Sequence, residues 1–339
     1  MKQPLFKIRE NGKFGFINKQ GEVVIEPQYF EAEDFYNGYS RVRLNNKLVP
    51  MDKMGRLLLK HFFNHVGYFE EGLARVKLVN RWGYLDTRGN IAIAVQFDQA
   101  TDFSEQLAAV SLDGYFGYIT TNSQFVIAPQ FDRAFEFKNG LAPVRIEERF
   151  GYIDKKGNMA IQPAFEQAFP FQASVAVIVR DKKWGLIDQE GQLLLEPQFD
   201  LVDDFINGEF FDGMAIAIQD YKFGFINQKG ELVVPPRFSF VGDFGEGMAL
   251  VEENEQFGFI DKNGDWTIHP QFEDAGVFSD GLAQVKVDGK WGFINTDGHI
   301  VVLPQFETVF PFREGLALVE YQKRWAYIDR FGDLIWKEV

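Results

Sequence analysis

Apolar and polar residues alternate in short stretches along the chain, a pattern typical of half-buried β-strands. Residues 281–288 (GLAQVKVD) alternate in this way. They end at Asp288-Gly289, a pair suited to a tight hairpin because both central residues take positive φ. An aromatic-rich stretch, 290–295, follows, and an Asn-x-x-Gly turn leads to the apolar run 300–303, which Pro304 ends by removing a ladder donor. The pattern predicts a three-stranded antiparallel meander.

The same pattern returns along the whole chain. An aromatic residue followed by Gly marks the second strand of each copy, at Phe14, Trp82, Phe116, Phe150, Trp184, Phe223, Phe257 and Trp291. Trp325-Ala326 continues the series, and Leu48-Val49 holds the same place in a degenerate second copy. The spacing is 34 residues, except for 39 between Trp184 and Phe223. We therefore expect a five-residue insertion (39 − 34 = 5) near Glu209–Gly213.

Two further aromatic positions recur in the same frame. Fifteen residues after each aromatic-Gly start stand Tyr29, Phe63, Phe97, Phe131, Phe165, Phe199, Phe238, Phe272 and Phe306. Twenty-one residues after it stand Phe35, Phe69, Phe103, Phe137, Phe171, Phe205, Phe244, Phe278 and Phe312. Because the comparison is internal to one chain, it reports a repeated structural requirement, and we expect these rings to fill the seams between successive meanders. The Gly after the first aromatic is expected where the backbones of neighbouring copies approach closely.

The predicted fold is all-β: a tandem array of ten antiparallel meanders of about 34 residues, forming a single array over residues 1–339. The repeats start near residues 1, 39, 73, 107, 141, 175, 214, 248, 282 and 316, and the last forms a C-terminal cap. We expect an open, solenoid-like superhelix, because propeller blades usually have four strands and these repeats show three. A closed β-propeller-like ring is the alternative.

These residues carry a resemblance. The stretch from Trp291 to Val319 reads Trp-Gly-Phe-Ile-Asn-x-x-Gly, an apolar run, Pro-Gln-Phe-Glu and Phe-x-x-Gly-Leu-Ala-x-Val. It resembles the WG-repeat family of bacterial β-rich repeats, and the resemblance covers essentially the whole chain. It implies an interaction module without an assigned chemistry. The departures are the degenerate copy at Leu48, Val95 in place of Pro, and the Glu209–Gly213 segment.

Composition narrows the function. The formal net charge is −14, which disfavours nucleic acid and anionic membranes as partners. The chain has no cysteine, which removes disulfides, thiolate nucleophiles and Cys-based metal sites. No apolar stretch is long enough for a membrane span, and the first ten residues do not form a signal peptide. We expect a cytoplasmic monomer, with export after removal of a signal as the alternative.

The sequence offers few groups that could converge on a reaction. His61 and His65 have the spacing of a metal pair only if their segment is helical, and no Glu lies between them in the place that helical zinc proteases use. No Gly-rich phosphate loop with Lys-Ser/Thr occurs. We therefore expect no enzyme activity, no metal and no cofactor.

The candidate partner-binding residues fall into two groups. One is a recurrent acid after the Pro-Gln-Phe motif, which would line up along the array as an anionic strip for a Lys/Arg-rich partner: Asp98, Asp132, Glu166, Asp200, Glu273 and Glu307. The other lies around the expected insertion: Glu209, Phe210, Phe211, Asp212 and Tyr221. A second partial row of acids is Glu71, Glu105, Glu246, Asp280 and Glu314. Both acidic rows have an alternative role, in which the carboxylates cap loop amides.

The functional hypothesis is a non-catalytic scaffold that presents an extended acidic, aromatic-rich repeat surface to a protein or peptide partner, which is basic if the acidic rows are used. A carbohydrate-binding array that uses Phe210, Phe211 or Trp266 is the alternative.

Overall fold

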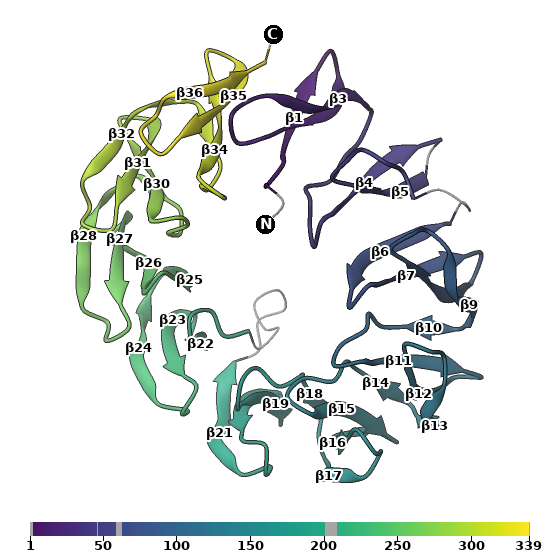
Figure 1. Ribbon diagram of the computed structural model, residues 1–339. Helices are drawn as coiled ribbons and strands as arrows, with labels where there is room; N and C mark the ends of the chain where they lie inside the picture. The colour runs from purple at the N-terminus through teal and green to yellow at the C-terminus, as the bar shows by residue number, and fades with distance from the viewer. Residues whose placement is uncertain (1–2, 46, 59–62, 201–208, 339) are drawn as a thin grey trace. The chain divides into compact units, whose positions relative to one another are not determined.

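The computed structural model describes residues 3–45, 47–58, 63–200 and 209–338 (Figure 1). Every regular element within these ranges is a β-strand. The chain divides into two compact units, Met1–Asn18 with Glu22–Leu193, and Lys19–Gly21 with Leu194–Val339. Phe205, one of the predicted core aromatics, lies outside the described residues.

Each repeat contributes a first, a second and a third strand in chain order. The first strands are β1 (Phe6–Glu10), β4 (Tyr39–Leu44), β7 (Leu73–Leu78), β11 (Leu107–Leu112), β15 (Leu141–Ile146), β19 (Ala176–Arg180), β22 (Met214–Gln219), β26 (Met248–Glu253), β30 (Leu282–Val287) and β34 (Leu316–Tyr321). The second strands are β2 (Lys13–Ile17), β5 (Lys47–Asp52), β8 (Arg81–Asp86), β12 (Tyr115–Thr120), β16 (Arg149–Asp154), β20 (Lys183–Ile187), β23 (Lys222–Asn227), β27 (Gln256–Asp261), β31 (Lys290–Asn295) and β35 (Arg324–Asp329). The third strands are β3 (Val23–Tyr29), β9 (Ile91–Phe97), β13 (Phe125–Phe131), β17 (Met159–Phe165), β21 (Leu193–Asp200), β24 (Leu232–Phe238), β28 (Trp266–Phe272), β32 (Ile300–Phe306) and β36 (Leu334–Lys337). The predicted all-β tandem array of antiparallel meanders is confirmed.

Seven sheets have a fourth strand, which we call the lead strand because it precedes the first strand in the chain. The lead strands are β6 (His65–Glu70), β10 (Gln99–Ala100), β14 (Arg133–Ala134), β18 (Gln167–Ala168), β25 (Phe240–Gly245), β29 (Asp274–Ala275) and β33 (Thr308–Val309). Each pairs with the first strand on the side away from the second. The prediction of three strands is therefore extended to four in these repeats. The second repeat has only the pair β4–β5 among its described residues.

Both predicted hairpin types are present. At the first hairpin, Asp113 and Gly114 take φ of 51° and 87°, as a turn with two left-handed central residues requires. At the second, Asp154 Oδ1 accepts the N–H groups of Lys156 and Asn158, each at 2.9 Å, and Gly157 has φ of 85°. The side chain of the Asp therefore replaces backbone partners inside the turn.

The Gly after the strand aromatic has a different role from the predicted one. A Cβ on Gly151 would lie 2.4 Å from Ile161 O and 2.8 Å from Pro163 N, in the third strand of its own repeat. The register of β16 and β17 shifts between Phe150 and Tyr152, so a bulge in the third strand crowds this position. The Gly makes room within its own sheet, and not between neighbouring repeats.

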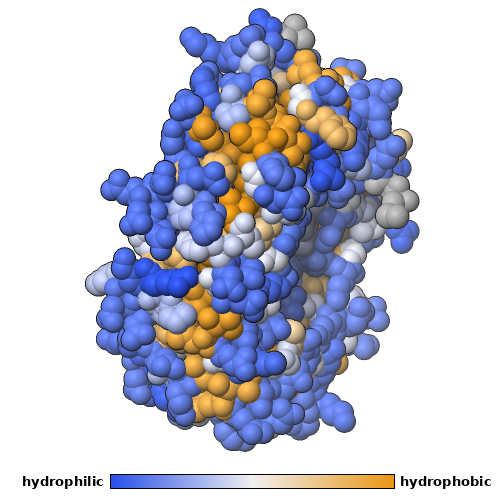
Figure 2. Space-filling view, turned by 90° about the vertical axis from the view of Figure 1, so that its left-hand side faces the viewer, coloured by the Kyte–Doolittle hydropathy of each residue, from blue (hydrophilic) through white to orange (hydrophobic). Residues whose placement is uncertain are grey.

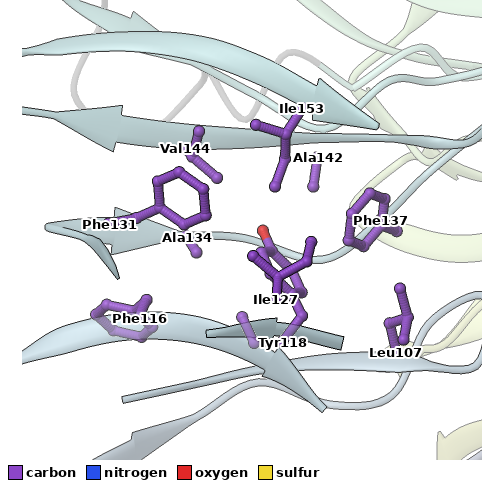
Figure 3. Close-up of a cluster of buried hydrophobic side chains, with 11 residues drawn as sticks. Leu107, Phe116, Tyr118, Ile127, Phe131, Ala134, Phe137, Ala142, Val144 and Ile153 are labelled. Atoms are coloured by element: carbon purple, nitrogen blue, oxygen red, sulfur yellow. The ribbon is translucent and has the colours of Figure 1, made fainter. Parts of the chain in front are cut away.

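The core lies in the seams between successive sheets, as predicted. Figure 3 shows the cluster between the fourth and fifth repeats. Phe131 and Phe137, which represent the two recurring aromatic positions, are 3% and 0% exposed there. The hydroxyl of Tyr118 in the same cluster donates to Phe135 O at 2.8 Å, which ties the second strand to the connection that follows.

Candidate interaction surface

The segment Glu209–Gly213 is not where the extra residues lie. Phe211 and Met214 form a bridge with reciprocal backbone hydrogen bonds of 2.9 and 3.0 Å. Ser279 and Leu282 make the same pair in a regular repeat. The turn before β22 is therefore the ordinary one, and the five additional residues fall before Glu209. The prediction was wrong because both Phe205 and Phe210 fit the aromatic position.

Two predicted aromatic residues are exposed near this turn. Phe211 is 39% exposed, whereas Phe210 is half-buried. Tyr221 is 94% exposed and lies at the tip of the hairpin that joins β22 to β23. Its φ of 60° is left-handed, a conformation that costs a non-glycine residue on the order of 1 kcal/mol. Tyr221 is therefore an exposed ring on a strained turn.

The acids after the Pro-Gln-Phe motif are mostly engaged inside the protein. Glu166 accepts the N–H groups of Asp181 and Lys182 at the next hairpin, at 3.2 and 3.1 Å, and Glu273 accepts that of Gly289. Asp98 pairs with Arg81, and Glu307 pairs with Lys290 at 2.6 Å. Asp132 is half-buried and makes no ion pair within the described ranges. Asp200 also has a partner. The row does not form a strip of free carboxylates.

A second set of acids joins five pairs of successive repeats; we call these contacts latches. A carboxylate on the turn before the first strand accepts a turn N–H 35 residues later. The pairs are Glu71–Gln106, Glu105–Gly140, Asp212–Gly247, Glu246–Gly281 and Asp280–Gly315, with N···O distances from 2.7 to 3.0 Å. Lys155 adds an ion pair to Glu105 at 3.0 Å, and Lys262 adds one to Asp212 at 2.7 Å. The structure therefore shows that the five latch carboxylates cap loop N–H groups, which is the alternative role that the sequence offered for the acidic rows.

Apolar side chains form a repeated exposed row at the start of the third strands; we call it the outer row. Its members are 37% to 58% exposed and lie in both compact units: Val23, Val24, Ile91, Phe125, Val126, Leu193, Leu194, Leu232, Ile300, Val301 and Leu334. The third strand is the last strand of each sheet, so the row borders an edge that no strand of the same sheet covers. Figure 2 shows apolar residues gathered in patches on the side that carries β28 and β32. The sequence analysis identified the apolar run but did not predict that its first residues are exposed.

The described residues hold no group of three His, Asp or Glu side chains that could bind a metal ion. His61 lies outside the described residues, and His65 packs edge-on against Trp82 at 5.4 Å between ring centroids. Within the described ranges, no helix is long and apolar enough to cross a membrane.

Comparison with models of known protein families shows which family the chain belongs to. The model of the WG containing repeat matches nine segments: residues 14–47, 51–80, 82–116, 116–149, 150–184, 184–223, 223–256, 257–291 and 291–325. The chain belongs to the WG-repeat family. No curated protein gives a significant match to it.

The WG-repeat array is similar to several solved structures at low identity. One, described as the crystal structure of the eukaryotic initiation factor, is 13% identical with a TM-score of 0.58, over 88% of this chain and 95% of that one. Dihydro-heme d1 dehydrogenase NirN in complex with DHE is 12% identical over 89% and 73%, with a TM-score of 0.42. BamB from Moraxella catarrhalis is 11% identical over 98% and 93%, with a TM-score of 0.34. The first of these supports the fold and says nothing about function.

The WG pair itself is structural. Trp184 is buried, Trp82 and Trp291 are half-buried in the seams, and the Gly makes room for the bulge described above. The family signature therefore specifies the array. Functional positions of this WG-repeat protein must lie where side chains are exposed or depart from the repeat.

Proposed function

We propose that this WG-repeat protein is a non-catalytic scaffold that presents an extended repeat surface to a protein or peptide partner. The observation that carries the proposal is the outer row, an exposed apolar position that recurs from repeat to repeat in both compact units. Exposed apolar residues that are arranged contiguously favour protein contacts, whereas scattered ones need no explanation. A repeated contact position lets a scaffold combine many weak contacts along one partner.

Tyr221 and Phe211 are the aromatic part of the proposed surface. A tyrosine that is almost fully exposed on a strained turn stabilises nothing in its own fold, so a contact outside the chain explains its presence. The acidic rows contribute less than the sequence suggests, because most of their carboxylates have partners inside the protein. Trp266, a candidate for carbohydrate binding, packs against Phe238, with 6.0 Å between the ring centroids. Its ring therefore also has a packing role inside the protein.

The test compares the wild type with the Tyr221→Gly variant. Each protein is cross-linked chemically in a lysate of the source cells, and the amount of captured partner is measured. We expect Tyr221→Gly to raise the free energy of unfolding by about 0.5–1 kcal/mol, because Gly accepts the left-handed turn without strain. Capture of the partner should fall at the same time. Urea melts and quantitative cross-linking measure the two effects.

Lys182→Gly is the matched control, because Lys182 has φ of 60° at the equivalent hairpin of the sixth repeat. This variant should gain similar stability and keep full capture. Equal capture by the wild type and by Tyr221→Gly would exclude a role for this hairpin in binding.

A further inference from the structure

Six polar side chains occupy equivalent places in three successive sheets of the first compact unit, on the lead and first strands. We call them the donor row: His65, Lys77, Gln99, Ser111, Arg133 and Arg145. They form directly opposed cross-strand pairs, His65 with Lys77, Gln99 with Ser111, and Arg133 with Arg145. The lead strands β6, β10 and β14 that carry them follow one another in space (Figure 1). All six can donate hydrogen bonds, and none carries a negative charge.

The pair Arg133–Arg145 places two guanidinium groups opposite each other. Like charges in direct cross-strand register destabilise a sheet. Within the described ranges neither side chain has a carboxylate partner within 4.0 Å, and this includes the adjacent Asp132. Arg145 Nε is buried and has no hydrogen-bond partner there, and neither has the buried Ser111 Oγ. Buried polar atoms without partners are costly, so the protein alone does not satisfy this site.

The pair His65–Lys77 repeats the pattern two sheets earlier. Lys77 Nζ lies 5.4 Å from the centroid of the Trp82 ring and makes no ion pair in the described part of the chain. Burial lowers the pKa of His65, and the positive charges of Arg75, Arg41 and Lys77 lower it further. Of the charged groups that act on His65, Arg75, Arg41 and Lys77 are positive, and Glu33 is negative.

Equivalent positions in three other repeats carry complementary pairs. Arg43 faces Glu31 at 2.6 Å, and Lys286 stands directly opposite Asp274. In the tenth repeat the hydroxyl of Thr308 donates to Glu320 at 2.8 Å. The fold thus accommodates an acid at this place, and the three pairs of the donor row carry none.

We propose that the donor row binds the oxyanion groups of an acidic peptide, with Arg133 and Arg145 holding one oxyanion between them. This inference deepens the proposed scaffold function and rests on it. A carboxylate or phosphate oxyanion accepts from both guanidinium groups at once, which removes their repulsion and supplies the missing acceptor. Gln99 offers a neutral donor in the next sheet, and Lys77 supplies the second charged position along the same row. The peptide lies across β7, β11 and β15.

The net charge of the chain does not oppose this binding. At physiological ionic strength charges are screened beyond about 8 Å, so the local groups determine the contact. Of the acids that precede the lead strands in the chain, Asp98 is engaged by Arg81, and Glu166 by the hairpin amides of Asp181 and Lys182. Asp132 makes no ion pair with Arg133 or Arg145 among the described residues.

The test measures binding of fluorescein-labelled hexaglutamate to the full chain by anisotropy, with a phosphoserine peptide of equal length, a hexalysine peptide and a single-stranded oligonucleotide as further probes. Arg133→Gln and Arg145→Gln should each raise the Kd for the acidic peptides about fivefold. Arg88→Gln is the matched control, because it removes the same charge from an exposed side chain outside the row. It should leave the Kd unchanged. The phosphoserine and hexaglutamate arms identify which oxyanion is preferred.

A thermal melt of each variant without peptide shows whether the variant is folded, so a loss of binding can be distinguished from misfolding. Arg133→Gln should keep or raise the unfolding temperature, since it relieves the opposed charges. Failure of wild-type protein to bind either acidic peptide overturns the proposal, as does an equal loss in Arg88→Gln or tighter binding of hexalysine or the oligonucleotide. None of these results contradicts the scaffold function if the wild type still captures a partner by cross-linking and the Tyr221→Gly variant does not.

Discussion

At the residue scale, the latches show how single carboxylates join neighbouring repeats. Burial raises the pKa of Glu105, but the hydrogen bonds from Lys155 and from the Gly140 N–H outweigh it, so the pKa lies below its ordinary value. A depressed pKa means that the ionised form is stabilised in the folded state. The corresponding stability is present above the unfolded-state pKa of about 4.3 and is lost as the pH falls through the folded-state value.

We expect Glu105→Gln to lower the free energy of unfolding by about 1 kcal/mol at pH 7, because the turn amide of Gly140 and the ammonium of Lys155 lose their charged acceptor. The difference from the wild type should be smaller at pH 3, which lies below the unfolded-state pKa of about 4.3, because the stability from a lowered pKa is lost as the pH falls below that value. Urea melts at the two pH values measure it.

Glu148→Gln is the control for Glu105→Gln. Glu148 is exposed in the next repeat and makes no hydrogen bond or ion pair among the described residues, so its replacement should change stability little. An equal loss in both variants would show that net charge, and not the latch, accounts for the effect.

At the element scale, the bulge in the third strand and the Gly of the second strand depend on each other, because the bulge leaves no room for a side chain at the Gly position. Seven glycines at this place, among them Gly117, Gly151 and Gly292, would bring a Cβ to between 2.2 and 2.7 Å of a third-strand carbonyl oxygen. The tenth repeat has Ala326 instead, and its β36 pairs with β35 through Ala326↔Lys337 and Tyr327↔Trp336. The alanine is tolerated because this last strand lacks the Pro-Gln-Phe segment.

We expect Gly151→Ala to destabilise the protein by about 3 kcal/mol, since the new methyl group meets backbone atoms that cannot move without breaking the sheet. Ala326→Gly should cost about 1 kcal/mol or less, the ordinary penalty for glycine in a strand. Chemical denaturation of both variants measures the difference. Similar losses in the two variants would contradict the proposed role of the bulge.

The sequence predicted the repeated elements well, because alternation and turn residues act locally and recur in every copy. Five of the seven lead strands were missed because two residues, such as Gln99–Ala100, are too few to show a strand pattern. The aromatic slot near Phe205 and Phe210 was assigned to the wrong residue because both fit the spacing. The outer row and the donor row depend on exposure and on cross-strand register, which become visible only when strands are paired.

At the scale of the whole molecule, repeated ionisable groups set the pH range of stability. The Asn158 side chain and nearby backbone N–H groups hold the pKa of Asp154 below its usual value, and the pKa values of Asp52, Asp86 and Asp261 at equivalent turns are also lowered. Burial raises the pKa values of Tyr84, Tyr118 and Tyr152. The aspartates therefore lose their contribution in acid, and the tyrosines lose theirs in alkali.

We expect the urea midpoint to be nearly constant between about pH 7 and pH 9 and to fall outside that range, since unfolded His titrates near pH 6.5 and the pKa of His65 is lowered in the folded protein. Unfolded Asp titrates near pH 3.9 and unfolded Tyr near pH 10. Tyr118→Phe should weaken the fall of the urea midpoint in alkali, because it removes one buried hydroxyl that ionises. The substitution fits the fold, since Phe occupies the same place in other repeats, as at Phe259. Circular dichroism melts across the range measure both. A steep change in the midpoint between pH 7 and pH 9 would contradict this account.

The latches also bear on how such an array can change its length over evolutionary time. Each latch carboxylate reaches forward by one repeat, and the turns of the fourth, eighth and ninth repeats both supply a carboxylate and receive one. A duplicate of one of these three repeats therefore brings its own acceptor and its own donor, and the two new junctions form without leaving either group unmatched. Gain or loss of a repeat by gene duplication or deletion preserves the bonding between neighbours, so lineages can lengthen or shorten the surface while each junction stays intact.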